Sequence, residues 1–493
     1  MSHLPLYPKA KAFLDQDSIP AFINGQWIDC SAGKLDVIDP ATGNAVTRVS
    51  TADASDVDKA VQAAHNAFPA WSGLSVQERA VMLHRLADAI DANIEVLSQL
   101  ESLDVGKPID NARGFDVPFG SECLRYFADL SVNATYDIPL AIKDMEARVH
   151  RAPFGVCGFI YPWNFPYMLF CWGCGPALAA GNTVVVKASE VTPLSTLFIG
   201  KLAEEAGIPA GVINIYTGTG QECGQPLVEH PLVKRMSFTG SSAVGKMIGR
   251  VCGESLKPCK LELGGKGAAL VLDDVDVAAA ATGLAGAITL NTGQVCCTAT
   301  RWFLHEKIYD EFVDKVRVEL SNTKINHGLI EGTQMGPLVS QAQLERVQDY
   351  YEKGLAGGAQ ALVELERPEV ADGSNGYFVS PHLLAGDEDN ICYREEVFGP
   401  TAYLVKYSDA DDAVQRVNQL AYGLANSVWS TDLERAAKLS EQVVAGNSWI
   451  NAHNVFAYGL PYGGVNASGN GGGVNSPETF NDYLRNQTIA RPL

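Results

Sequence analysis

A cysteine and a glutamate in this chain could share one reaction. Cys296 lies in the polar run NTGQVCC at 291–297, and a turn of this kind exposes a thiol to a cleft instead of burying it. Glu262 lies 34 residues upstream (296 − 262), where the apolar run LEL at 261–263 meets two glycines. A thiolate is a strong nucleophile, and a carboxylate whose pKa is raised by partial burial can take a proton from water. The pair therefore predicts a cysteine nucleophile and a general base.

Asn164 could supply a third group that such chemistry needs. Attack of a thiol on a carbonyl creates an oxyanion, which a fixed amide or a backbone N–H group can stabilise. Asn164 lies in PWNFP at 162–166, where two prolines with Trp163 and Phe165 would hold it in place. Taken singly, each of the three residues also fits a plainer explanation: a buried free cysteine, a strand-end glutamate bonded to backbone N–H groups, and a turn residue before a proline.

Two further segments have residues that could bind a dinucleotide. The usual G-x-G-x-x-G motif is absent after the first strand, but GSSAVG at 240–245 follows a strand and opens a helix, as phosphate sites do. Lys187 and Glu190 end the second strand and could hold a ribose diol. A carboxylate there repels a 2′-phosphate, so NAD is favoured over NADP. Each signal is weak alone, because many such turns bind nothing and many such pairs lie at the surface.

These residues must be positioned by an α/β fold. From residue 155 on, short apolar runs alternate with helical stretches such as Thr192–Ala206, which is typical of a parallel sheet with helices on both faces. Ligands bind such sheets at the carboxyl ends of the strands. The predicted strands are Val156–Tyr161, Thr183–Lys187, Val212–Tyr216, Arg235–Phe238 and Pro258–Leu263 and, in a second α/β unit, Ala299–His305, Thr401–Tyr407, Asn426–Trp429 and Ser448–Asn451.

Other elements also have local signals. Ala21–Ile28 has the pattern of a hairpin that turns at Asn24-Gly25. SVQE at 75–78 matches a capping box, and the residues behind it repeat at helical spacing. The alanine-rich run Val277–Leu290 predicts a buried helix that is too short to span a bilayer. Tyr462–Gly473 is glycine-rich and is predicted to be a loop.

Size and composition limit the class of protein. A chain of 493 residues favours two or three domains, and 46% hydrophobic with 19% charged residues is typical of a globular protein with sizeable cores. The net charge of −20 disfavours nucleic-acid or membrane binding. The 11 cysteines form no disulfide pattern, Cys171 and Cys174 are predicted to pack in a helix, and no metal site is predicted. No apolar secretion signal is visible, so a cytoplasmic location is expected.

The motifs together resemble the large non-acylating superfamily of NAD(P)-dependent aldehyde dehydrogenases. The resemblance covers nearly the whole chain, and several separate motifs in one order are not expected by chance. They are LDVGKP at 103–108, PWNFP at 162–166, ALAAGNTVVVKASEVTP at 177–193, FTGSSAVG at 238–245, LELGGK at 261–266, NTGQVCCTATR at 291–301, EEVFGP at 395–400 and PYGG at 461–464.

The resemblance implies a reaction and a role for each catalytic residue. Cys296 would add to the aldehyde as a thiohemiacetal, and hydride transfer to NAD would leave a thioester. Asn164 and the Cys296 backbone N–H would form the oxyanion hole. Glu262 would activate the water that releases the carboxylic acid. Coenzyme-A-acylating relatives typically lack this glutamate, so its presence favours hydrolysis.

The resemblance also implies a cofactor site and an architecture. Lys187 and Glu190 would bind the adenosine ribose, Ser241 with the helix behind Gly240 would take the pyrophosphate, Glu396 would hold the nicotinamide ribose, and Phe398 would pack against it; Trp163 and Gly245 belong to the same predicted site. The implied fold has a Rossmann-like NAD-binding domain at 1–131 and 152–263 and an α/β catalytic domain at 264–470. Residues 132–151 and 471–493 would form a small β oligomerisation arm and tail of a homodimer or homotetramer.

The substrate follows less directly from the sequence. Because the positions that match the family's substrate tunnel include no lysine or arginine, an anionic semialdehyde is disfavoured and an apolar or aromatic aldehyde is expected. The alternative is betaine aldehyde or an aminoaldehyde held by cation–π contacts. YFAD at 126–129 resembles that branch, whereas Leu290, where its plant members tend to carry an aromatic residue, weakens the cage. Ordinary core packing is the plain explanation for part of the set, which is Phe119, Phe165, Met168, Trp172, Leu290, Val295, Cys297, Phe456 and Tyr462.

One segment departs from the family's pattern. The family commonly follows PxGG with a lysine and then SGxGRE. Here Asn466 replaces the lysine, and SGNGGG at 468–473 lacks the Arg-Glu pair. This departure leaves the catalytic residues untouched but predicts a more mobile tail through residues 470–476.

Overall fold

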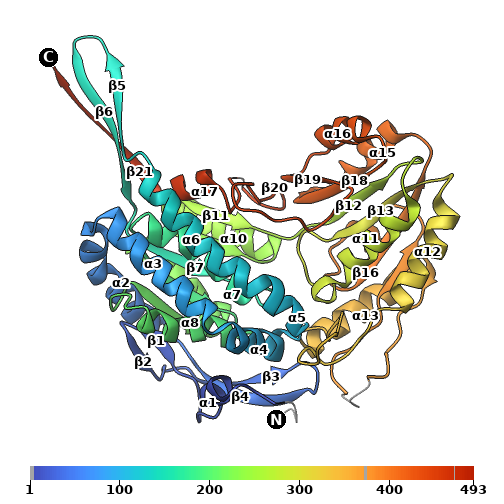
Figure 1. Ribbon diagram of the computed structural model, residues 1–493, viewed down its shortest axis with the longest axis horizontal. Coiled ribbons are helices and arrows are strands. Elements are labelled where there is room, and N and C mark those ends of the chain that lie inside the picture. Colours follow the sequence, from blue (N-terminus) through green and yellow to red (C-terminus); the bar gives the residue numbers. More distant parts are fainter. Residues whose placement is uncertain (1–4, 371–374, 471) are drawn as a thin grey trace.

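The computed structural model describes residues 5–370, 375–470 and 472–493. Two large sheets lie side by side, each with helices on both faces, and a long hairpin projects from the first half (Figure 1). The predicted α/β class with mostly parallel strands is confirmed. The connection from the first sheet to the second runs through residues 263–266, directly after Glu262.

The first sheet holds all five of its predicted strands in parallel, in the order β11-β10-β7-β8-β9. The amino-terminal strands join it at the β9 edge. The predicted hairpin is confirmed, with Asn24 and Gly25 at φ of 53° and 69°, as its tight turn requires. The strands are β1 (Ala21–Ile23), β2 (Gln26–Ile28), β3 (Gly33–Asp39), β4 (Asn44–Thr51), β7 (Val156–Ile160), β8 (Thr183–Ala188), β9 (Ile213–Thr217), β10 (Val233–Thr239) and β11 (Cys259–Glu262).

Helices cover both faces of the first sheet. Helices α3, α6, α7 and α8 bury apolar side chains against one face, and α2, α9 and α10 do so against the other. The capping box at Ser75 and Glu78 is present and starts α3. The helices are α1 (Pro8–Leu14), α2 (Ala54–Gly73), α3 (Val76–Asp91), α4 (Ile94–Val105), α5 (Ile109–Asn111), η1 (Ala112–Asp116), α6 (Val117–Asn133), α7 (Pro166–Ala179), α8 (Leu194–Glu205), η2 (Gly220–Gly224), α9 (Gln225–Glu229) and α10 (Ser242–Glu254).

The second sheet has the order β14-β15-β16-β13-β12-β18-β19, and only β14 is antiparallel to its neighbour. Its four predicted strands are present, but β12, β14 and β15 were not predicted. β12 begins Gly-Ala-Ala and β14 is four residues long, so neither has the β-branched run that marks a strand. The strands are β12 (Gly267–Val271), β13 (Ala299–His305), β14 (Gln360–Val363), β15 (His382–Ala385), β16 (Thr401–Tyr407), β18 (Ala425–Trp429) and β19 (Asn447–Ile450).

Helices again lie on both faces of the second sheet, with α11 and α12 on one and α13, α15 and α16 on the other. The alanine-rich run forms α11 and is largely buried, as predicted. In the part of the chain that the structure describes, no helix has the length and apolar character needed to cross a membrane. The helices are α11 (Val277–Thr289), η3 (Leu290–Gly293), α12 (Tyr309–Ser321), α13 (Gln341–Ala356), α14 (Ile391–Arg394), α15 (Ala410–Val417), α16 (Leu433–Gln442) and α17 (Pro477–Asn481).

The predicted arm is a three-stranded antiparallel sheet. Strands β5 (Asp137–Ile142) and β6 (Met145–Pro153) form the projecting hairpin, and β21 (Leu484–Pro492) pairs with β6 along its whole length (Figure 1). The predicted loop at 462–473 contains one short strand, β20 (Val465–Asn466), which pairs with β17 (Tyr422–Gly423). Gly471 lies outside the described residues, and the mobility of the tail stays a prediction.

Candidate active site

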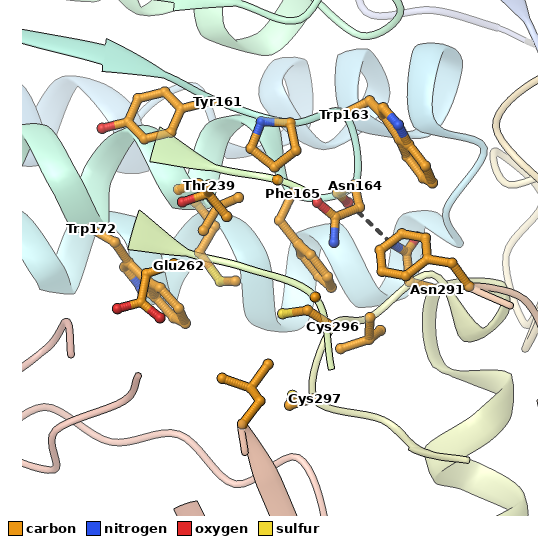
Figure 2. Close-up of a pocket in the computed structure, with 18 of the residues that line it drawn as sticks. Tyr161, Trp163, Asn164, Phe165, Trp172, Thr239, Glu262, Asn291, Cys296 and Cys297 are labelled. Atoms are coloured by element: carbon orange, nitrogen blue, oxygen red, sulfur yellow. Dashed lines mark hydrogen bonds between the residues drawn. The ribbon is translucent and has the colours of Figure 1, made fainter. Parts of the chain in front are cut away.

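The three predicted catalytic residues lie around one cavity of about 490 Å³, and Figure 2 shows them together. Asn164 follows the carboxyl end of β7, and Glu262 is the last residue of β11 in the same parallel sheet. Cys296 comes from the turn between η3 and β13. The carboxyl ends of parallel strands lie at one edge of the sheet. The first sheet therefore places the Asn164 amide and the Glu262 carboxyl group at that edge, where they face the Cys296 thiol from the turn before β13.

The turn before Cys296 has an unusual backbone. Asn291 and Thr292 have φ of 47° and 58°, in the left-handed region, and Gly293 has φ of 70°. A Cβ on Gly293 would lie 2.2 Å from the Gly399 carbonyl oxygen, so only glycine fits there. Strained backbone of this kind is found at functional sites, where the surrounding structure must hold it.

Hydrogen bonds connect this turn to Asn164, the residue predicted to bind the oxyanion. The Asn291 Nδ2 donates to the Asn164 carbonyl oxygen at 3.0 Å, and the Asn164 Nδ2 donates to the Gln294 carbonyl oxygen at 3.0 Å. The Gln294 side chain in turn accepts from the Val339 backbone N–H at 2.9 Å. An amide nitrogen carries two N–H donors, so Asn164 keeps one for a developing oxyanion.

The environment of Cys296 favours its thiolate. Its Sγ lies 3.2 Å from the Tyr462 hydroxyl oxygen, and the residue is half-buried. The Cys297 thiol and then the Tyr462 hydroxyl stabilise the thiolate and lower the pKa of Cys296, against the effect of burial. The neighbouring Cys297 donates to the Asn454 Oδ1 at 3.2 Å, and burial raises its pKa well above its usual value. Cys296 is therefore the better nucleophile of the two.

Glu262 is a buried carboxyl group with no hydrogen-bond partner for either oxygen among the described residues. Burial raises its pKa to about 8, against the opposing charge of Lys260. The sequence-based expectation of a raised pKa is confirmed. A free carboxylate beside a cavity, with a pKa near neutrality, is suited to take a proton from water.

Five of the residues predicted to bind the cofactor line this cavity: Trp163, Gly240, Ser241, Glu396 and Phe398. Lys187, Glu190 and Gly245 do not. Lys187 near the end of β8 and Glu190 just after it form an ion pair at 2.5 Å. A Cβ on Gly245 would lie 2.3 Å from the Leu263 side chain, so this glycine allows α10 to pack closely on the chain after β11.

The geometry around the predicted cofactor residues fits a dinucleotide. Ser241 caps the 13-residue helix α10, and its amino-terminal end is exposed, which leaves backbone N–H groups for an anion. The Glu396 Oε1 accepts from the Gly265 backbone N–H at 2.8 Å, and burial raises its pKa to about 7. Phe398 has φ of 64° and meets Trp163 edge to face at 5.2 Å.

The predicted substrate residues, apart from Phe119, all line the cavity and give it an aromatic wall. Trp172, Phe456 and Tyr462 have ring centroids 5.3–5.7 Å apart. Phe119 lies behind Phe115, which the sequence did not single out, with their rings stacked at 5.0 Å. Phe115 lies in the π-helical turn η1. Its spacing of four residues from Phe119 was the one sequence signal that could have placed it beside Phe119 on the same helical face. The lining residues that were predicted are Phe165, Met168, Trp172, Leu290, Val295, Cys297, Phe456 and Tyr462.

Two cations also line the cavity, although the predicted tunnel positions included none. Lys107 is buried and pairs with Glu101 at 3.0 Å and with Asp116, and its Nζ lies 4.2 Å from the centre of the Phe165 ring. Arg346 donates to the Glu396 carbonyl oxygen at 2.6 Å. Two carboxylates already neutralise Lys107, so it is not a free anchor for an anionic substrate.

The fold and the site together define a two-sheet α/β protein in which a cysteine thiol and a buried carboxyl group line one cavity. Residues 27–489 match the profile described as "Aldehyde dehydrogenase family", and the chain belongs to this family. A phenylacetaldehyde dehydrogenase of Pseudomonas fluorescens is 39% identical, with 91% of each chain covered. Two solved structures are also similar: an NAD+ complex of an aldehyde dehydrogenase from Bacillus cereus (35% identity, TM-score 0.96, 99% of each chain) and indole-3-acetaldehyde dehydrogenase complexed with NAD+ (34% identity, TM-score 0.94, 98% of each chain).

Proposed function

We propose that this aldehyde dehydrogenase uses NAD to oxidise apolar or aromatic aldehydes to carboxylic acids. The observation that carries the proposal is that the Cys296 thiol, favoured as thiolate, and the buried Glu262 carboxyl line one aromatic-walled cavity. A thiolate suits addition to an aldehyde, and a carboxylate base suits hydrolysis of the acyl group that follows.

The catalytic residues would act in sequence. The Cys296 thiolate adds to the aldehyde carbon, and the second N–H of Asn164 with the Cys296 backbone N–H receives the oxyanion. NAD, when bound, supplies the acceptor for the hydride. The acyl group is then held as a thioester on Cys296, and water that gives its proton to Glu262 attacks it. Cys296 leaves as the thiolate, and the product is the carboxylic acid.

The proposed NAD site draws residues from the regions of both sheets. Ser241 and Gly240 at the start of α10 would hold the pyrophosphate, Lys187 with Glu190 the adenosine ribose, and Glu396 with Phe398 the nicotinamide ribose. The Glu190 carboxylate would repel a 2′-phosphate, so NADP is the less favoured cofactor. Both solved relatives above are NAD+ complexes, which supports the same choice.

The remaining structural assignments are part of the same proposal. Residues 1–131 and 152–263 would form the NAD-binding domain, 264–470 the catalytic domain, and 132–151 with 471–493 the arm and tail. The projecting hairpin exposes Ile142, and β21 exposes Ile489, which fits contact with a second copy in a homodimer or homotetramer. The cytoplasmic location stays an expectation from the sequence.

The aromatic wall leads to a prediction about substrate preference. Benzaldehyde or phenylacetaldehyde should give the highest kcat/KM, roughly tenfold or more above succinic semialdehyde, because the cavity wall offers ring faces and its lysine, Lys107, is already paired with two carboxylates. Two relatives named for phenylacetaldehyde and indole-3-acetaldehyde support this order. The measurement is NADH absorbance with a panel that also contains hexanal and betaine aldehyde.

The same panel tests the alternative. Betaine aldehyde carries a quaternary ammonium group, which Trp172, Phe456 and Tyr462 could hold by cation–π contacts. If betaine aldehyde has the highest kcat/KM, the cationic substrate class replaces the aromatic one. The Cys296→Ala variant is the blank for aldehyde-independent absorbance.

Asn164 gives a second prediction. Asn164→Ala should lower kcat by about 10²–10³-fold, because the oxyanion loses one fixed donor. The measurement is kcat on the best aldehyde, with cofactor affinity followed by protein fluorescence. Unchanged cofactor affinity and melting temperature would show that the fold is intact. A loss below about threefold in kcat would exclude Asn164 from the oxyanion site.

A further inference from the structure

A buried lysine lies on the same strand as the catalytic carboxylate. Lys260 precedes Glu262 by two residues in β11, and alternate residues of a strand share one face. Leu261 between them packs into the core on the other side. The Lys260 side chain is only 2% exposed, and its Nζ pairs with the Asp482 Oδ2 at 2.7 Å. Asp482 follows α17, and its side chain is 36% exposed, so the pair connects the buried strand to the surface.

The Gly473 carbonyl group, which accepts a hydrogen bond from Lys260, lies in the chain segment that packs beside Glu262. The Lys260 Nζ also donates to the Gly473 carbonyl oxygen. A Cβ on Gly463 would lie 2.4 Å from the Gly473 Cα and 2.9 Å from the Glu262 Oε1. The backbone at Gly463 and the backbone at Gly473 therefore pass each other directly next to the Glu262 carboxyl group, and there is no room for a side chain on Gly463. Lys260 fixes one side of that crossing.

The segment held by Lys260 is the one that departs from the family's pattern. Gly472 and Gly473 stand where the Arg-Glu pair is common, and the Lys260 Nζ lies 3.6 Å from where a Cβ on Gly472 would be. Asn470 adds a second attachment to β11, since its Oδ1 accepts from the Leu261 N–H at 2.9 Å and its Nδ2 donates to the Cys259 carbonyl oxygen at 2.8 Å. The tail is therefore docked onto the strand of the catalytic base by side chains of this chain.

We propose that the Lys260–Asp482 pair is a positioning device that sets the proton affinity of Glu262 during hydrolysis of the acyl-enzyme. This inference rests on the proposed function. The positive charge of Lys260 favours the Glu262 carboxylate, and the negative charge of Asp482 limits that effect. The charged and titratable groups that act on Glu262 are Lys260 on its own strand, Cys296 from the turn before β13, and Asp482 after α17.

The hydrolytic step depends on this balance. Water forms a bond from its oxygen to the acyl carbon and gives one proton to Glu262, the bond from carbon to the Cys296 sulfur breaks, and the thiolate leaves. Burial is the largest cause of the raised pKa of Glu262, and Lys260 is the largest charge that opposes the rise. Without Lys260 the carboxyl group would stay protonated to higher pH and could not take the proton.

The test is the pH dependence of the hydrolytic step, separated from the earlier steps by rapid mixing. The first burst of NADH reports formation of the acyl-enzyme, and the steady state after it reports hydrolysis where hydrolysis is slower. Lys260→Met should move the acid limb of the steady-state rate up by about one pH unit. Asp482→Asn should move it in the opposite direction. Lys260→Arg keeps the charge and should restore the wild-type limb.

Opposite shifts from the two variants would not arise from a merely loosened tail. If Lys260→Met and Asp482→Asn keep the wild-type acid limb, or shift it in the same direction, the inference is wrong. Absence of any aldehyde-dependent NADH formation by the wild-type enzyme would instead contradict the proposed function. Melting temperatures of all variants at one pH identify any variant that fails to fold. If Lys260→Met is one of them, the downward shift expected for Asp482→Asn carries the test.

Discussion

Cys296→Ala should lower aldehyde oxidation by at least about 10⁴-fold, to the level of the blank, because removal of a covalent nucleophile removes the reaction path itself. The thiol is half-buried, lies 3.2 Å from the Tyr462 hydroxyl oxygen and has a lowered pKa. The measurement is NADH formation with the best aldehyde at saturating cofactor. Cofactor binding should persist, since the Cys296 side chain is not among the predicted cofactor residues.

Cys297→Ala is the matched control for that variant. The Cys297 thiol is adjacent in sequence but is buried and donates to Asn454. Its loss should leave activity within about tenfold of wild type. It should also raise the pKa of Cys296, because the single S–H that can turn from Asn454 to the Cys296 thiolate is gone. An active Cys296→Ala together with an inactive Cys297→Ala would make Cys297 the nucleophile and overturn the assignment.

Glu262→Gln should separate the two halves of the reaction. The amide cannot take a proton from water, so steady-state turnover should fall by about 10³-fold while one burst of NADH per active site remains. In wild-type enzyme the hydrolytic rate should rise with pH through about 8, because only the deprotonated carboxyl group is a base. The variant should lose that limb. Loss of the burst as well as the turnover would place Glu262 in the first half of the reaction.

The same variant should change stability in a pH-dependent way. The pKa of Glu262 in the folded chain is raised from 4.5 to about 8, so the folded state binds the proton more tightly than the unfolded state. The stability that this group contributes is present below pH 4.5 and is lost as the pH rises through about 8. Glutamine has no charge to bury, so the melting temperature of Glu262→Gln should rise relative to wild type across that window.

Local sequence signals predicted most of the elements and the candidate reacting groups. Asn24-Gly25 predicts its hairpin because glycine and asparagine adopt positive φ easily, and the alternation of apolar runs and helices from residue 155 predicts parallel strands. The polar turn around Cys296 and the strand end at Glu262 are local features too. They place chemically competent side chains at turns and strand ends, and the structure brings them to one cavity.

Weak local signals account for the missed elements. The strand β12 has small residues and is held by strands on both sides, β13 and β18, which come later in the chain. The assignment of Gly245 to the cofactor stays a prediction from the motif, and its close packing is against Leu263, a residue that the motif does not include. In both cases the deciding neighbours come from outside the local pattern, so propensity alone was not informative.

The sequence by itself determined the parallel α/β architecture and the family resemblance, and it supplied the hypothesis of a cysteine nucleophile and a carboxylate base, because each depends on short runs of residues. Only the tertiary structure decided which side chains meet. Phe115 joins the cavity wall through a π-helical turn, Lys107 is neutralised by Glu101 and Asp116, and Lys260 reaches a carbonyl oxygen 213 residues away. Such contacts depend on strand order and on how the two sheets and the tail pack, and residue spacing along the chain does not encode these distances.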